Sequence, residues 1–149
     1  KFHGFTGRGQ IEGHDVRLLL PTTFMNRSGQ SVVPFAKFYQ VAPEAILVAH
    51  DELDMDPGVI RLKSGGGHGG HNGLRDIVPH IGANFHRLRI GIGHPGSKER
   101  VSGHVLNKAP SSEQHLMDAA IDHALSKVKL LVDGQVSLAM NQINAYKPA

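Results

Sequence analysis

The stretch Lys63-Ser-Gly-Gly-Gly-His-Gly-Gly-His-Asn-Gly-Leu-Arg-Asp76 places a glycine-rich loop between a predicted strand and a predicted helix. Glycine loses much conformational entropy on folding and buries no side chain. Its density here therefore indicates turns with positive φ, or a close approach of the backbone to a bound molecule. His68, His71 and Asn72 add hydrogen-bonding groups to the loop. A flexible linker is the alternative, but linkers are rich in serine and charge rather than imidazole, so we interpret the loop as part of a binding site.

The elements on either side of the loop set its context. Val59 to Lys63 is predicted to be a strand in which Arg61 and Lys63 share one face, because side chains alternate along a strand. The helix is predicted to open at Asn72, whose side chain could cap it. A helix N-terminus favours an anion or a carbonyl oxygen nearby. Capping and substrate binding therefore compete for the Asn72 side chain.

Two further strands are predicted around this unit. Ala45 to His50 is a short continuous apolar run, which suits a strand buried on both faces, and Asp51 follows at its end. Phe85 to Ile92 alternates, with Arg87 and Arg89 on one face. Strands thus lie on both sides of the glycine loop in the sequence.

The N-terminal part is predicted to form a hairpin that feeds a strand. The turn falls near Gly13, and the β-prone run from Val16 to Leu20 follows it. A helix is then expected from Met25 onward, with Thr22 or Thr23 as its cap.

The C-terminal part is predicted to be helical. The stretch from Gly93 to His104 lacks periodicity and is long for a connection, so we expect a functional loop or lid. Ser111 and Gln114 fit a capping box, and the helix that they open should end at Gly134. A second helix is expected from Val136 to Ala145. Alternating strands and helices without an internal repeat predict an α/β fold with a largely parallel or mixed sheet.

Length and composition indicate one globular domain over residues 1–149. Hydrophobic residues make up 40% and charged residues 19%, which excludes a disordered chain. Cysteine is absent, which excludes disulfides and thiolate chemistry. No apolar run reaches membrane-spanning length, so we expect a soluble cytoplasmic protein. The chain opens on Lys1 rather than methionine, and we expect that its start is missing.

The charge is unevenly distributed. Residues 59–108 carry two acids, Asp76 and Glu99, against eight Lys or Arg. The eight cations are Arg61, Lys63, Arg75, Arg87, Arg89, Lys98, Arg100 and Lys108. This excess favours a polyanionic partner such as nucleic acid, although solvated surface cations remain an alternative explanation.

Three polar residues lie where predicted strands end or helices begin: Asn26, Asp51 and Asn72. In an open α/β sheet such ends gather around one crevice. Two amides could hold the carbonyl and amide groups of a substrate while the carboxylate orients a histidine base. The structural alternatives are a helix cap for Asn26 and a solvated loop acid for Asp51.

Other chemistries are less well supported. His68 and His71 lack the helical spacing of a zinc-binding pair, and no third ligand has a recognisable offset. The glycines match neither the P-loop nor the dinucleotide pattern, and no Gly-x-Ser-x-Gly elbow of a serine hydrolase is present.

Four motifs in order resemble bacterial peptidyl-tRNA hydrolase over essentially the whole chain. They are Thr22-Thr-Phe-Met-Asn-Arg-Ser-Gly29, Val48-Ala-His-Asp-Glu-Leu-Asp54, Gly65-Gly-Gly-His-Gly-Gly-His-Asn-Gly-Leu-Arg-Asp-Ile77 and Arg87-Leu-Arg-Ile-Gly-Ile-Gly-His-Pro-Gly96. The resemblance implies a single domain with a central twisted mixed β-sheet flanked by helices. It also implies hydrolysis of the ester between peptide and tRNA, which recycles tRNA in translation, by a monomer that needs no metal or cofactor.

The resemblance also implies roles for individual residues. Asp51 would orient the catalytic histidine, and Asn72 would help to place the water. Met25, Asn26, His71 and Asn72 would bind the substrate, and Lys63 and Arg89 would contact tRNA phosphate. The region 95–105 would be a mobile loop over the cleft.

One family feature is absent from this sequence. The family begins with a strand and a Gly-Leu-Gly-Asn-Pro-Gly motif, followed by Thr-Arg-His-Asn, whose histidine is the general base. No histidine here matches that base, and we expect a truncated record of an intact enzyme. The alternative is a non-catalytic RNA-binding relative, as in plant chloroplast intron-splicing factors that resemble this family.

Overall fold

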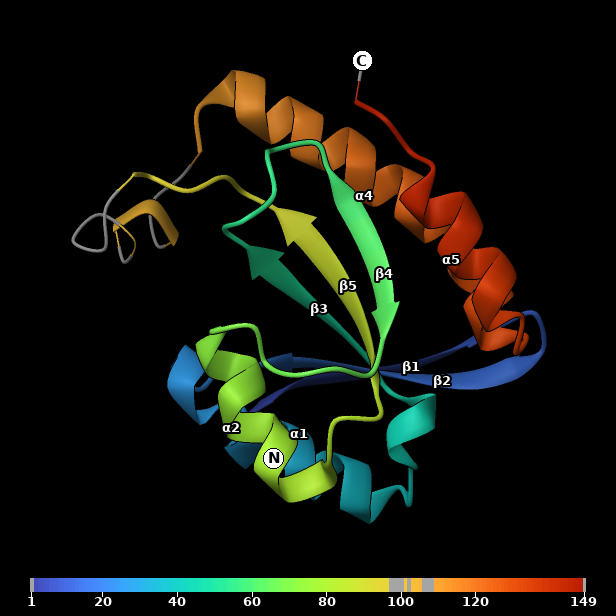
Figure 1. Cartoon of the computed structure of the whole chain (residues 1–149). Coiled ribbons are helices and arrows are strands. Elements are labelled where there is room, and N and C mark those ends of the chain that lie inside the picture. Colours follow the sequence, from blue (N-terminus) through green and yellow to red (C-terminus); the bar gives the residue numbers. More distant parts are fainter. Residues whose placement is uncertain (1, 97–100, 102, 106–108, 149) are drawn as a thin grey trace. The chain divides into compact units, whose positions relative to one another are not determined.

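The computed structural model describes residues 2–96, 101, 103–105 and 109–148 (Figure 1). The chain divides into two compact units, each assembled from two separate stretches of sequence. Unit 1 comprises residues 1–48 and 64–86, and unit 2 comprises residues 49–63 and 87–149. The glycine loop and the helix after it belong to unit 1, whereas the strand before the loop belongs mainly to unit 2.

Unit 1 begins with the predicted hairpin. Strands β1 (Gly4–Ile11) and β2 (His14–Pro21) pair antiparallel along their whole length. Glu12 and Gly13 both have positive φ, at 50° and 79°, as a two-residue type I′ turn requires. The hairpin prediction is confirmed, and the predicted Val16–Leu20 strand is the second half of that hairpin.

The helix after the hairpin starts later than predicted. Met25–Arg27 form a 3₁₀ turn, η1, and the α-helix α1 runs from Gly29 to Phe38. The N-cap residues are Phe24 and Ser28, and no side chain caps either element; the Thr22 hydroxyl donates to the His3 carbonyl at 2.9 Å. The predicted threonine cap is therefore wrong.

The glycine loop leads into α2 (Asn72–Ile81), which packs on a small apolar core within unit 1. Leu74 and Ile77 of α2 are 2% exposed, and Phe85 is fully buried beside them. Half-buried apolar side chains surround these three: Val32, Ile46, Val48, Val78 and Ile81. The 3₁₀ turn η2 (Pro43–Ala45) leads into the next strand.

Three strands form a second sheet in the order β3-β5-β4. They are β3 (Leu47–Glu52), β4 (Ile60–Ser64) and β5 (His86–Gly91). His86 N donates to Ile46 O, and Ile92 N donates to Glu52 O. Residue numbers thus rise in the same direction along both strands, so β3 and β5 run parallel. The arrows in Figure 1 show the same direction for these two strands.

Strand β4 runs antiparallel to β5, which makes the sheet mixed. Gly65 N donates to Phe85 O, and Gly91 N donates to Val59 O, so residue numbers rise along one strand as they fall along the other. The predicted α/β class and mixed sheet are confirmed.

The expectation that the Ala45–His50 run is buried on both faces is wrong. Ala49 is exposed, and Leu47 and Val48 are only half-buried. Among the three strands β3 lies at the edge, so it has a strand neighbour on one side only. An edge strand has fewer side chains packed around it than a central one.

Unit 2 contains two helices, α4 (Ser111–Val132) and α5 (Val136–Asn144), which pack on each other. Gly134, with φ of 83°, ends the first helix as predicted. The predicted capping box is wrong, because the Gln114 side chain donates to Asp118 at 2.8 Å and no side chain caps the helix. In the part of the chain that the structure describes, no helix is long and apolar enough to cross a membrane.

Helix α5 is fastened to β4 by a side-chain amide. Leu62 N donates to Asn144 Oδ1 at 2.7 Å, and Asn144 Nδ2 donates to Leu62 O at 3.2 Å. Arg61 donates to the Asn144 carbonyl at 2.9 Å. The free backbone groups of β4 are thereby satisfied at Leu62.

Candidate active site

The glycine loop in unit 1 has the backbone conformation that its composition predicts. Four of its glycines, Gly65, Gly66, Gly69 and Gly70, have positive φ. The last two form a turn closed by a bond from His71 N to His68 O at 2.9 Å. Residues with side chains rarely adopt such angles, so the loop needs glycine at these positions.

His71, rather than Asn72, caps helix α2. Its Nδ1 accepts hydrogen bonds from Gly73 N at 3.1 Å and from Leu74 N at 3.3 Å. Asn72 is the first residue of the helix and its side chain is exposed. The prediction that Asn72 caps the helix is wrong. The His71 imidazole is the cap, so the Asn72 side chain is not used for capping.

The 3₁₀ turn η1 lies against the start of α2. A Cβ added at Gly73 would lie 2.9 Å from Met25 Sδ and 3.1 Å from Ser28 Oγ, so only glycine allows this approach. The Ser28 hydroxyl donates to the Met25 carbonyl at 2.7 Å and is thereby fixed. Asn26, in the middle of the turn, is exposed.

A carboxylate on α2 holds the start of α1. Asp76 Oδ2 accepts the Gly29 N–H at 2.6 Å, and Gly29 is buried. Gly29 is the first residue of α1, so this bond satisfies one of the unpaired N–H groups at the helix start. The structure therefore brings Met25, Asn26, His71 and Asn72 together on two segments that are fastened to each other.

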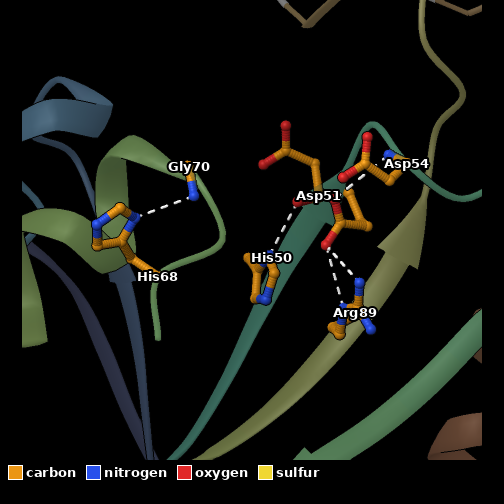
Figure 2. Close-up of polar contacts among 7 residues, drawn as sticks. His50, Asp51, Asp54, His68, Gly70 and Arg89 are labelled. Carbon is orange, nitrogen blue, oxygen red and sulfur yellow. Dashed lines mark hydrogen bonds and ion pairs between the residues drawn. The ribbon is translucent and has the colours of Figure 1, made fainter. Parts of the chain in front are cut away.

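Three histidines are held in the same neutral tautomer. In each, Nδ1 accepts the backbone N–H two residues later: His68 from Gly70 at 2.9 Å, His71 from Gly73 at 3.1 Å and His94 from Gly96 at 3.1 Å. The first of these bonds is drawn in Figure 2. The proton of the neutral ring is therefore on Nε2, which makes each side chain a hydrogen-bond donor there. These histidine-closed turns were not predicted, although the repeated His-x-Gly spacing signals them.

In unit 2, Asp51 follows His50 near the end of β3. His50 is 8% exposed, and its Nδ1 bonds to the backbone carbonyl of Asp51 at 2.8 Å. A carbonyl only accepts, so Nδ1 carries the proton. Asp51 is half-buried, and Figure 2 shows its carboxylate directed away from the His50 ring. The period of two in a strand places them so.

The neighbouring acid, Glu52, is paired with Arg89. Its Oε1 accepts from Arg89 Nη2 at 2.9 Å and from Nε at 3.1 Å, and the two side chains are 14% and 31% exposed. The backbone N–H of Asp54 donates to the other carboxylate oxygen at 3.3 Å. The ion pair joins β3 to β5, and Figure 2 draws it as dashed lines at Arg89. Arg89 was predicted as a cation for a polyanionic partner, and its ion pair with Glu52 was not predicted.

The basic stretch is less uniform in the structure than in the sequence. Lys63 is exposed on β4 and shares a face with Arg61, as predicted. Arg87 is 2% exposed, and burial lowers the pKa of its guanidinium below the usual value. It is therefore a core residue rather than a surface cation. Lys98, Arg100 and Lys108 lie outside the described residues.

The predicted lid also lies partly outside the description. Residues 97–100 and 102 are not described, so the proposed loop over a cleft is not tested. At its start, Gly93 N donates to the Met55 carbonyl at 2.8 Å. Further along, His104 Nε2 donates to the Ile92 carbonyl at 2.8 Å.

Metal binding is not supported by the described residues, which contain no cluster of three or more His, Asp or Glu side chains able to hold an ion. The predicted absence of a metal or cofactor stays a prediction.

These features define an α/β protein with two exposed amide side chains, Asn26 on a 3₁₀ turn and Asn72 at a helix start, on segments that contact each other. The family model described as peptidyl-tRNA hydrolase matches residues 1–149. The chain is 89% identical over 149 residues to the peptidyl-tRNA hydrolase of Acinetobacter baumannii strain AYE, covering all of this chain and 77% of the relative. It is 63% identical over 147 residues to that of Psychrobacter cryohalolentis, covering 99% and 76%.

A solved structure from the same family has the same fold. A crystal structure of peptidyl-tRNA hydrolase from A. baumannii superimposes with a TM-score of 0.97 at 88% identity, covering 99% of this chain and 76% of that one. The chain belongs to the peptidyl-tRNA hydrolase family.

Proposed function

We propose that this protein hydrolyses the ester bond between peptide and tRNA in peptidyl-tRNA, and so recycles tRNA during translation. Family membership supports the reaction, and one structural observation carries the assignment of residues. Because His71 takes over the helix cap, the Asn72 amide at the start of α2 is left exposed, on a segment fastened to the one that carries Asn26. Amides both donate and accept hydrogen bonds, as recognition of a peptide backbone requires.

The proposed reaction is attack of water on the ester carbonyl. A histidine base takes a proton from water, the C–O bond to ribose breaks, and the ribose hydroxyl leaves with a proton. Asn72 helps to place the water, and Asn26 and Met25 bind the peptidyl end. A ribose hydroxyl leaves more readily than an amine, so one base and a few donors suffice without a metal.

Asp51 is proposed to orient the histidine base and to stabilise its protonated form. In the family that base belongs to the Thr-Arg-His-Asn motif, which this sequence does not contain. Neutral His68, His71 and His94 carry their proton on Nε2, while Nδ1 accepts from the backbone. We therefore assign them to hydrogen-bond donation rather than to the role of base, and His71 both caps α2 and faces the substrate.

The tRNA body is proposed to contact Lys63. The side chain is exposed on β4, and no hydrogen bond or ion pair engages it among the described residues. Arg89 stays a weaker prediction, because its charge is already paired with Glu52. The proposed monomeric state rests on the family resemblance alone.

The role of Asn72 is tested by hydrolysis of peptidyl-tRNA with the natural gene product and its Asn72→Ala variant. We expect kcat/KM to fall at least about tenfold, which corresponds to the loss of one or two hydrogen bonds in the transition state. Asn141→Ala removes an exposed amide from α5 and should leave the rate unchanged. Equal rates for Asn72→Ala and the wild type would remove Asn72 from the mechanism.

The rival function is RNA binding without catalysis. It predicts that the natural gene product binds tRNA but does not release peptide from peptidyl-tRNA. The mass and the N-terminal sequence of that product decide the matter most cheaply, since a Thr-Arg-His-Asn segment favours the enzyme.

A further inference from the structure

A serine and a histidine in unit 1 form a pair that the hydrolase reaction does not use. Ser64 Oγ lies 2.6 Å from His86 Nδ1, and His86 Nε2 lies 2.9 Å from the Glu44 carbonyl oxygen. The serine is the last residue of β4, and the histidine is the first of β5. The two are 22 residues apart in sequence.

The tautomer of His86 follows from its partners. A carbonyl oxygen only accepts, so Nε2 must carry a proton and donate to Glu44. In the neutral ring Nδ1 is then unprotonated and accepts the Ser64 hydroxyl proton. The hydroxyl thus points its proton at a base whose ring is oriented by a third group. This arrangement is the one that activates serine nucleophiles.

The two side chains differ in their exposure. Ser64 is exposed, so an electrophile in solution can reach its oxygen, whereas His86 is half-buried and its ring is fixed at both nitrogens. We propose that Ser64 is a nucleophilic serine, with His86 as its base, that accepts an acyl group from an activated ester. Neither Ser64 nor His86 is among the residues assigned to peptidyl-tRNA.

The proposed step transfers an acyl group to Ser64 Oγ. A bond forms between Ser64 Oγ and the acyl carbon, and the bond from that carbon to the leaving oxygen breaks. The hydroxyl proton passes to His86 Nδ1, and the leaving group departs as an alkoxide or phenolate that takes a proton from water or from the imidazolium. The Glu44 carbonyl carries no full charge, so it stabilises the imidazolium less than a carboxylate would. We therefore expect modest activation, towards good leaving groups.

The test measures the rate of phosphonylation by an alkyl fluorophosphonate, which forms a stable adduct as fluoride leaves and the proton goes to the base. Peptide mapping by mass spectrometry assigns the adduct to its residue. Ser126 is an internal control, because it is also exposed and its hydroxyl donates at 2.6 Å, but to the His123 carbonyl rather than to a base. We expect Ser64 to react at least about tenfold faster than Ser126, which is less than the roughly hundredfold low end of general base catalysis because the Glu44 carbonyl stabilises the imidazolium only weakly.

His86→Asn separates basicity from hydrogen bonding. The asparagine oxygen can still accept a hydrogen bond from the Ser64 hydroxyl, but it is too weak a base to remove the proton. Labelling of Ser64 should therefore fall to the Ser126 rate. Circular dichroism checks that the variant is folded, and the comparison within the wild type needs no variant at all. Labelling of Ser64 no faster than Ser126 would overturn the proposal, as would an undiminished rate in a folded His86→Asn protein.

Discussion

At the scale of single residues, two neighbouring side chains at the start of α2 have different roles. His71 and Asn72 are adjacent, and both could cap a helix. The structure gives the cap to the His71 imidazole, whose Nδ1 accepts from two backbone N–H groups. Sequence reasoning could name both residues as site residues, but not which would cap, since asparagine is the commoner cap by propensity.

Loss of the cap should destabilise the protein measurably. We expect His71→Ala to lower the free energy of unfolding by about 1 kcal/mol, as for other N-cap removals, whereas His71→Asn should restore most of it because asparagine caps well. Urea denaturation measures both. His68→Ala is the control, since His68 accepts one N–H in an exposed turn. If His68→Ala were the more costly change, the capping role of His71 would be wrong.

The close approach at Gly73 gives a second prediction. A Cβ at this position would meet Met25 Sδ and Ser28 Oγ within 3.1 Å, so Gly73→Ala should cost about 1–3 kcal/mol of unfolding free energy by overpacking. Gly67→Ala is the matched control in the same loop, because nothing lies within 4 Å of its added Cβ and its φ is not positive. Chemical denaturation of both variants checks the prediction, and equal costs would contradict it.

At the scale of elements, the start of α1 depends on a carboxylate from another helix. The expected threonine cap failed because no threonine reaches the helix, whose first residue, Gly29, is bonded by Asp76 instead. The two residues are 47 positions apart. A contact between residues so far apart leaves no pattern in the local sequence. The turn at Gly13 and the helix end at Gly134 were predicted because each needs a positive φ, which glycine adopts readily.

Removal of the Asp76 carboxylate should loosen α1. Asp76→Ala leaves the buried Gly29 N–H without its charged acceptor, so we expect a loss of about 1.5–3 kcal/mol of unfolding free energy. Asp118→Ala removes an exposed acceptor whose side-chain partner among the described residues is Gln114, and it should cost less than half as much. Thermal and urea denaturation measure both changes. A cost for Asp76→Ala no greater than that of the control would show that the bond contributes little.

At the scale of the whole molecule, the class of fold was readable from the sequence and the use of its charges was not. Alternating periodicities predicted the α/β class. Charge counting treated Arg87 and Arg89 alike as cations for a polyanion, yet the first is buried and the second is paired with Glu52. Burial and ion pairing depend on tertiary packing, so a count along the chain overstates the exposed charge.

Exposed Lys63 should carry part of the affinity for tRNA. We expect Lys63→Ala to weaken tRNA binding and to reduce the slope of log K against log salt by about 1, the signature of one lost phosphate contact. Lys129→Ala removes an exposed lysine from the last turn of α4 and should leave the slope unchanged. Fluorescence titrations over a range of salt concentrations measure both. Equal slopes for the two variants would remove Lys63 from the tRNA interface.

Asp51 is proposed to orient a histidine base in the hydrolysis of peptidyl-tRNA. The most direct test is the rate of peptide release from peptidyl-tRNA by the natural gene product, compared with its Asp51→Asn and Asp54→Asn variants. Asp54 lies exposed in the following turn, so it controls for the loss of one negative charge. We predict that Asp51→Asn lowers kcat by at least about a hundredfold with the fold intact, while Asp54→Asn stays near the wild-type rate. A folded Asp51→Asn protein that releases peptide within about twofold of the wild-type rate would show that Asp51 does not orient the base.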